Sequence, residues 1–192
     1  MYRVICSLLL IYYLPTAIAQ SATKPPTQAI DNDFVRKQFG STCRLEPGPP
    51  PLAADLNGDG VEDVVIIARC SNPLIDEAEN KYKVIDPYDE FFGYGDPKVT
   101  TKFASEDPQQ HGLALLIIHG AGSDAWRAVE PKAKFLVINL PFKQIAVKKL
   151  TVRKKTVMAI YAEEAREGEG TVSVIFWDGK KYKYQPMGSV ME

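Results

Sequence analysis

Apolar residues occur along the chain in short runs bounded by polar residues, glycine or proline. Runs of this kind, rich in strand-forming residues such as valine and isoleucine, predict β-strands at residues 63–69, 113–119, 134–140, 156–162 and 171–177. Several runs are apolar at consecutive positions instead of alternating with polar residues. Continuous apolar runs are typical of strands that are covered on both faces.

Helical spacing of apolar residues is rarer than these strand-like runs. In residues 30–40, "IDNDFVRKQFG", apolar side chains recur at helical spacing between a capping residue, Asp31 or Asn32, and Gly40, which ends the pattern. We therefore expect one short amphipathic helix near the N-terminal end of the domain. Weaker helical patterns occur at residues 73–82 and 161–170.

A β-hairpin is predicted near the C-terminus, where "FWDGKKYKY" places Asp178-Gly179 between two strand-like runs. An Asp-Gly pair favours a two-residue hairpin turn. With Asp178 and Gly179 as the two turn residues, Trp177 faces Lys180 and Ile175 faces Tyr182 on the neighbouring strand.

Three other segments have distinctive compositions. Residues 46–54 are rich in proline, which excludes a helix or a central strand and predicts a stiff connector. Residues 148–155, "KKLTVRKK", alternate basic and apolar positions, which predicts a solvated strand pair whose lysines protect a sheet edge. Residues 86–97 gather acids, aromatic residues and glycines and are interpreted as a packed loop, with ligand contact as the alternative.

These elements predict an α+β, mainly β fold in a single domain. We expect an antiparallel or mixed sheet, the C-terminal hairpin and the short N-terminal helix. The acidic motif described below occurs once, and no internal repeat is present.

The N-terminal residues match a secretory signal peptide. Residues 1–19 contain one basic residue, an apolar run and small residues before a cleavage site after Ala19. The alternative, a membrane anchor, requires an apolar run of roughly 20 residues, which is longer than the one present. The polar, proline-containing residues 20–28 predict a disordered leader, which leaves residues 29–192 as the globular domain. We expect a secreted or periplasmic protein without a membrane span after cleavage.

Charge and cysteine content bear on the possible ligands and on disulfide formation. The chain has 23 basic and 24 acidic residues, and this balance predicts no general affinity for nucleic acid or anionic lipid. Signal cleavage removes Cys6 and leaves Cys43 and Cys70, which in an exported protein most simply form one disulfide. Two buried free thiols are the alternative.

The segment "DLNGDGVED" has the spacing of a calcium loop. Its predicted ligands are the side-chain oxygens of Asp55, Asn57, Asp59 and Asp63, with the backbone carbonyl of Val61 as a fifth. Calcium takes six to eight oxygen ligands, and a chain that curls around it offers alternate side chains while glycine allows the sharp turn. Because aspartate, asparagine and glycine also favour turns, a polar turn without an ion is the alternative.

This motif resembles the calcium loops of FG-GAP/VCBS-type proteins, in which D-x-[DN]-x-D-G-x-x-D precedes a hydrophobic strand. It is also similar to the first nine residues of an EF-hand or dockerin loop. However, the twelfth position is Ile66 instead of an acid, and a strand-like run replaces the helix expected after an EF-hand loop. The resemblance covers about 15 residues, so it implies a structural calcium ion at residues 55–63 and does not imply the propeller of those families.

Sequence signals for catalysis are weak. A strand that ends at His119, Gly120 and Gly122 resembles the oxyanion loop of secreted esterases, but the chain contains no G-x-S-x-G motif. His119 also lies too close in sequence to Ser123 and Asp124 for an ordinary triad. With two histidines and no C-x-x-C or H-E-x-x-H motif, the sequence also argues against zinc.

The sequence thus predicts a calcium-stabilised binding or interaction module for an unknown protein or carbohydrate ligand. No catalytic residue is assigned, and a non-enzymatic role is favoured. Two alternatives remain open: a secreted hydrolase that uses His119 with distant carboxylates, and an inhibitor of another secreted enzyme.

Overall fold

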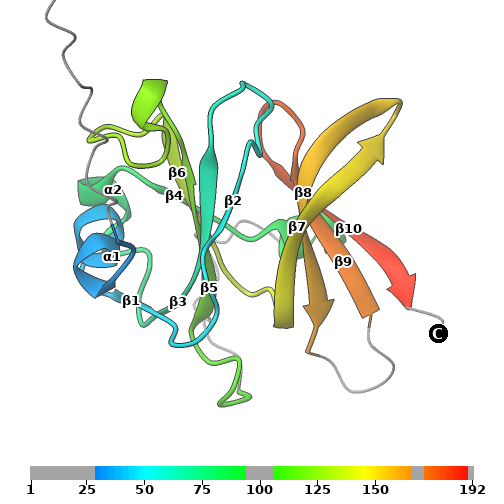
Figure 1. Cartoon of the computed structure of the whole chain (residues 1–192). Coiled ribbons are helices and arrows are strands. Elements are labelled where there is room, and N and C mark those ends of the chain that lie inside the picture. The colour runs from blue at the N-terminus through cyan, green and yellow to red at the C-terminus, as the bar shows by residue number, and fades with distance from the viewer. Residues whose placement is uncertain (1–28, 94–105, 166–170, 190–192) are drawn as a thin grey trace, which may run out of the picture.

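A computed structural model describes residues 29–93, 106–165 and 171–189 (Figure 1). The predicted signal peptide, residues 1–19, and the predicted leader, residues 20–28, lie outside the described residues. No described helix is long and apolar enough to cross a membrane.

Strands make up most of the described secondary structure. The strands are β1 (Cys43–Leu45), β2 (Leu52–Ala54), β3 (Asp63–Cys70), β4 (Lys83–Ile85), β5 (Leu113–His119), β6 (Ala133–Val137), β7 (Phe142–Val152), β8 (Lys155–Glu164), β9 (Thr171–Trp177) and β10 (Tyr182–Ser189). The helices are α1 (Asn32–Phe39), α2 (Glu77–Asn80), α3 (Pro87–Phe92) and the 3-10 helix η1 (Gly122–Asp124).

The strands form two sheets. The larger has six strands in the order β1-β3-β5-β6-β4, with β2 also paired to β3. Its pairs are antiparallel except for β4 and β6, which run parallel, so the sheet is mixed. The smaller sheet is an antiparallel meander in the order β10-β9-β8-β7. This mainly β, single-domain arrangement confirms the predicted fold class.

The six-stranded sheet lies between helices α1 and α2 on one side and the second sheet on the other, as Figure 1 shows, whereas α3 packs against β10 of the second sheet. Val64 and Ile66 of β3 pack with α1 residues such as Phe34 in one core cluster. Their neighbours Val65 and Ile67 pack in a second cluster, which lies between the two sheets. Because successive strand residues point to opposite faces, a strand buried on both faces is apolar at every position, as predicted.

Helix α1 begins and ends where the sequence predicts. The Asp31 side chain accepts a hydrogen bond from the backbone N–H of Phe34 at 2.8 Å, and Gly40 closes the helix with a φ of 88°. Gly40 also leaves room for Asp76, since a Cβ atom at position 40 would lie 2.3 Å from a carboxylate oxygen of that residue.

Two predictions of local structure are corrected. The helical pattern predicted at residues 161–170 is wrong for residues 161–164, because β8 continues to Glu164, whose side chain turns inward and is buried, while residues 166–170 lie outside the described residues. Pairing with β9 overrides the local helical preference. The predicted loop at residues 86–97 contains helix α3, which Asp86 caps by accepting a hydrogen bond from the Asp89 N–H at 2.8 Å. Residues 94–97 lie outside the described residues.

The C-terminal hairpin is present, but its predicted register is wrong. Trp177 pairs with Tyr182 instead of Lys180, and Ile175 pairs with Tyr184 instead of Tyr182. The Asp178 side chain accepts hydrogen bonds from the backbone N–H groups of Lys180 and Lys181, at 2.8 and 2.9 Å. Asp178 therefore precedes the turn, and Gly179, with a φ of 102°, occupies the first corner.

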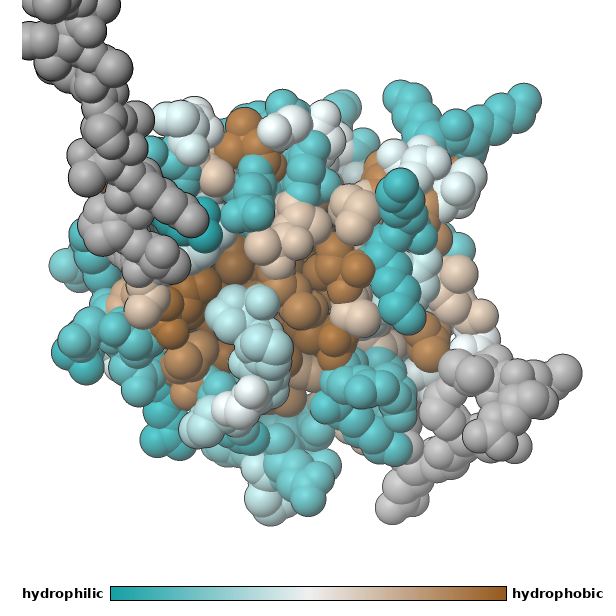
Figure 2. Space-filling view, viewed as in Figure 1, coloured by the Kyte–Doolittle hydropathy of each residue, from teal (hydrophilic) through white to brown (hydrophobic). Residues whose placement is uncertain are grey.

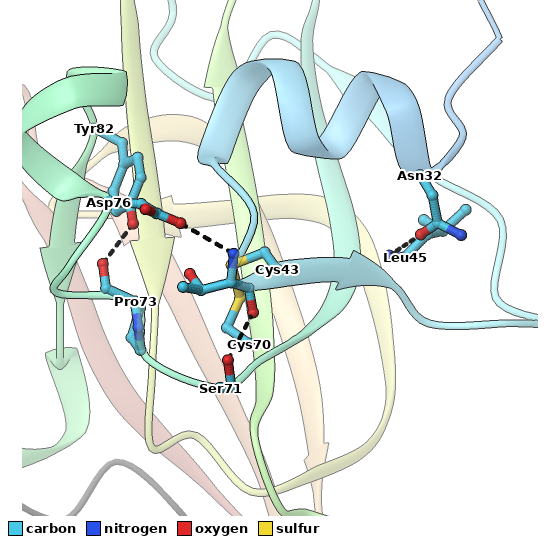
Figure 3. Close-up of a disulfide and its surroundings, with 9 residues drawn as sticks. Asn32, Cys43, Leu45, Cys70, Ser71, Pro73, Asp76 and Tyr82 are labelled. Atoms are coloured by element: carbon cyan, nitrogen blue, oxygen red, sulfur yellow. Dashed lines mark hydrogen bonds between the residues drawn. A yellow bond between two sulfur atoms is a disulfide. The ribbon is translucent and has the colours of Figure 1, made fainter.

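The predicted disulfide is present and joins two neighbouring strands. Cys43 of β1 lies directly opposite Cys70 of β3, and Figure 3 shows the bridge beneath the end of α1. The same region is held by Asp76, whose carboxylate accepts a hydrogen bond from the Thr42 N–H at 3.0 Å. Tyr82 completes the cluster by donating its hydroxyl proton to the carbonyl of Pro73.

Candidate functional site: the acidic loop

The acidic loop connects β2 to β3. These strands pair antiparallel, with Ala54 opposite Asp63, so residues 55–62 form the loop of a hairpin. Because β3 is buried on both faces, the loop fixes the point at which the chain enters the core.

The loop side chains turn towards the loop's own backbone. Asp55 accepts hydrogen bonds from the backbone N–H groups of residues 58–60, at 2.8, 3.1 and 2.8 Å. Asn57 accepts one from the N–H of Asp59, and Asp59 accepts one from the N–H of Val61, both at 2.9 Å. These bonds hold the oxygens of alternate residues in defined positions along the turn.

Asp63 differs from the other predicted ligands because it is completely buried. Its carboxylate accepts hydrogen bonds from three backbone N–H groups: Leu56 at 2.8 Å, Asn57 at 3.3 Å and Gly120 at 2.8 Å. Burial raises the pKa of Asp63 to about 6, although the three amides act in the opposite direction. Asp63 therefore ties the loop, β3 and the end of β5 together.

A second segment, the connection between β5 and β6, packs against the acidic loop. The Lys132 ammonium lies 2.7 Å from a carboxylate oxygen of Asp59, and this hydrogen bond lowers the pKa of Asp59. Glu62 accepts a hydrogen bond from the indole N–H of Trp126 at 3.0 Å and pairs with Arg127 at 3.4 Å. Lys132 is 73 residues away from Asp59, so local spacing contains no signal for this contact.

Close backbone packing explains why a glycine, Gly120, follows β5. A Cβ atom at this position would lie 2.3 Å from the carbonyl oxygen of Glu62 and 2.6 Å from the carbonyl carbon of Ala125. Only glycine allows this close approach of backbone segments. Close packing of the acidic loop against the β5–β6 connection explains the glycine without any oxyanion chemistry.

His119 lies between the two sheets. Its side chain is 2% exposed, and its Nε2 lies 2.7 Å from the hydroxyl of Tyr182. Phe135 and Trp177 surround the imidazole, with ring centroids 5.0 and 5.1 Å away. Burial lowers the pKa of His119 to about 4, so the neutral ring is favoured. In this structure an external substrate has no access to His119, which acts as a polar contact between the sheets.

The burial of His119 predicts a pH effect on stability. The unfolded chain binds a proton near pH 6.5, whereas folded His119 does so near pH 4. The free energy of unfolding therefore falls as the pH drops through this window, by up to about 3 kcal/mol from this residue. We expect NMR of the imidazole to show a mainly neutral ring above pH 5.

The control for this prediction is His119→Gln, which retains a hydrogen-bonding side chain but cannot titrate. Asp63 and Asp86, whose pKa values burial raises to about 6, affect stability in the opposite direction over the same range. The quantity to measure is therefore the difference between wild type and variant at each pH. An imidazole titrating near pH 6.5 at position 119 would contradict the prediction.

The oxygen donors of the loop are of the chemical type that a hard divalent cation prefers, with two restrictions on their arrangement. A carboxylate has about four lone-pair positions, and the backbone hydrogen bonds leave at least one of them open on Asp55, Asp59 and Asp63. Lys132 already neutralises part of the charge at Asp59, so a cation has to displace or share that contact. Among the described residues, no three histidine, cysteine or acidic side chains are arranged around a common point as in a metal site.

Comparisons of the chain with protein-family models, with curated proteins and with solved structures found no match.

Proposed function

We propose that the protein is a secreted or periplasmic interaction module, and that the acidic loop binds a structural calcium ion. The observation that carries this proposal is the arrangement of the loop, in which oxygens from alternate residues are held by backbone amides at the entry to β3. Calcium here has a structural role, because the loop is docked on core elements through the buried Asp63, which bonds to the end of β5. The disulfide supports an oxidising destination.

The proposed ligands are the side chains of Asp55, Asn57, Asp59 and Asp63 and the carbonyl of Val61. Three carboxylates repel one another, and this repulsion is reduced by any cation in the loop. Lys132 supplies one positive charge to Asp59. A divalent ion supplies two charges and has room for all the oxygen donors, so it stabilises the loop further.

Calcium removal is expected to lower the melting temperature by about 5 to 10 °C. With an affinity of about 10 μM and free calcium of about 1 mM, linkage gives roughly 2.7 kcal/mol of stability. The measurement is a thermal melt of the mature protein with calcium and with chelator. Asp59→Ala should remove most of the calcium response, because it deletes a carboxylate ligand.

Lys132→Met provides a sharper test of the same site. This variant removes the ammonium that competes for Asp59, so it should bind calcium more tightly than wild type while being less stable in chelator. Titration calorimetry measures the affinity directly. The loop would be a polar turn without an ion if the wild-type melting temperature did not respond to calcium and neither wild type nor Lys132→Met gave a heat of binding.

A further inference from the structure

Basic residues gather at one end of the four-stranded sheet. In an antiparallel meander the β7–β8 and β9–β10 turns lie at the same end, and Figure 1 shows both at the top of this sheet. Residues 148–155 contain five lysines or arginines and no acid, and residues 178–185 contain three lysines and one acid. We call these two segments the basic tip. The chain as a whole has a net charge of −1, so its charges are strongly segregated.

The basic tip surrounds a hollow on the outer face of the sheet. The hollow has a volume of about 490 Å³, which lies within the range of ligand-binding clefts. Its apolar part is formed by Val152, Val157, Phe176 and Trp177. Three cationic side chains from both segments line it, Arg153, Lys155 and Lys183, against one acid, Asp178. The apolar part continues along the sheet into the outer cluster around Leu150, Ala159 and Val174.

Most of the positive charge at the tip is not neutralised. Lys181 and Lys183 face Glu90 of α3, with Lys183 at 3.6 Å. In the part of the chain that the structure describes, Arg153, Lys154 and Lys155 pair with no carboxylate. Figure 2 shows the β7–β8 turn as hydrophilic side chains that project from the molecule at the upper right. Unpaired charges of one sign beside a hollow attract ligands of the opposite sign.

We propose that the basic tip binds an acidic segment of a partner polypeptide, in which apolar side chains alternate with carboxylates. This inference rests on the interaction role proposed above and names the partner's chemistry. The carboxylates meet Arg153 and Lys155, while an apolar side chain covers Phe176. A neutral sugar leaves the cations unpaired, and the phosphates of a nucleic acid duplex leave the apolar part of the hollow uncovered.

The test uses a fluorescein-labelled peptide of eight residues that alternates glutamate with leucine. Fluorescence anisotropy with the mature protein should show saturable binding that weakens as salt rises from 50 to 300 mM. Arg153→Glu/Lys155→Glu should weaken binding by about tenfold or more, because exposed charge pairs and steering are reversed. Phe176→Ser should weaken it at every salt concentration. Circular dichroism confirms that each variant is folded.

Arg36→Glu/Lys37→Glu is the matched control, since it makes the same charge change on α1 and should leave the affinity unchanged. An alternating lysine–leucine peptide should not bind. The proposal is overturned by equal binding of that peptide, by no binding of the acidic peptide, or by preferential binding of duplex DNA or an anionic polysaccharide independent of Phe176. Self-association through the tip, seen by sedimentation, would also overturn it in favour of a second copy.

The binding assay is run with calcium and with chelator. Failure of the tip proposal appears as loss of peptide binding with a normal calcium response in the melt. Failure of the calcium proposal appears as a melting temperature that is the same with calcium and with chelator, whether or not the peptide binds.

Discussion

Asp63→Ala is expected to lower the melting temperature by about 10 °C or more, measured in chelator so that calcium plays no part. The substitution removes the acceptor of three backbone N–H groups, on Leu56, Asn57 and Gly120. Each buried donor left without a partner costs about 1 to 3 kcal/mol, so roughly 4 kcal/mol is lost. The loop also loses its attachment to β5.

Asp63→Asn keeps an acceptor oxygen but places an amide N–H₂ where the carboxylate accepted hydrogen bonds. Its melting temperature should therefore lie between those of wild type and Asp63→Ala. Asp124→Ala is the matched control, because Asp124 is exposed in the neighbouring connection and its removal should change stability by less than about 0.5 kcal/mol. If Asp63→Ala has the same melting temperature as wild type, water satisfies the three backbone amides.

The sequence predicts the central strands well because their signal is local. The five predicted strands correspond to β3, β5, β6, β8 and β9. Each is an apolar run whose own composition favours a strand. The cap and stop of α1 are local signals too, and both are found.

The short or polar elements could not be predicted in the same way, because partners distant in sequence define them. Strand β2 is three residues long and exists through its pairing with β3. The end of β8 is acidic and locally helical in pattern, yet β9 holds it in the sheet. In the hairpin, Asp178 stands before the two corner residues, and its side chain accepts a hydrogen bond from the Lys180 N–H. The observed strand register therefore differs from the predicted one by two residues.

For the candidate site, spacing along the chain identifies the oxygen donors but not what surrounds them. The alternate positions of Asp55, Asn57 and Asp59 are visible in the sequence. The contacts of Asp63 with Gly120 and of Asp59 with Lys132 arise only when the β5–β6 connection folds over the loop. The basic tip likewise joins two segments that are separate in sequence and meet because β7 to β10 form a meander.

Cys43→Ala/Cys70→Ala is expected to melt about 10 °C below wild type. The disulfide closes a loop with a sequence separation of 27 residues. The chain-entropy model gives roughly 3.5 kcal/mol for a loop of this length, and a domain of this size loses a few degrees per kcal/mol. Before the melt, the intact mass of the unreduced wild type should be two hydrogens below that of the dithiol, and peptide mapping should join Cys43 to Cys70.

The double variant should still respond to calcium by the same number of degrees as wild type. Asp63 and Cys70 lie at opposite ends of β3. At about 3.3 Å per residue they are roughly 23 Å apart, and distant sites without shared partners contribute additively to stability. Melts of wild type, double variant, Asp59→Ala and the combined variant, each with calcium and with chelator, complete the cycle. If the calcium response disappears with the disulfide, the bridge is needed to shape the acidic loop. If the double variant is as stable as wild type, the pairing of β1 with β3 is enough to hold this edge of the sheet.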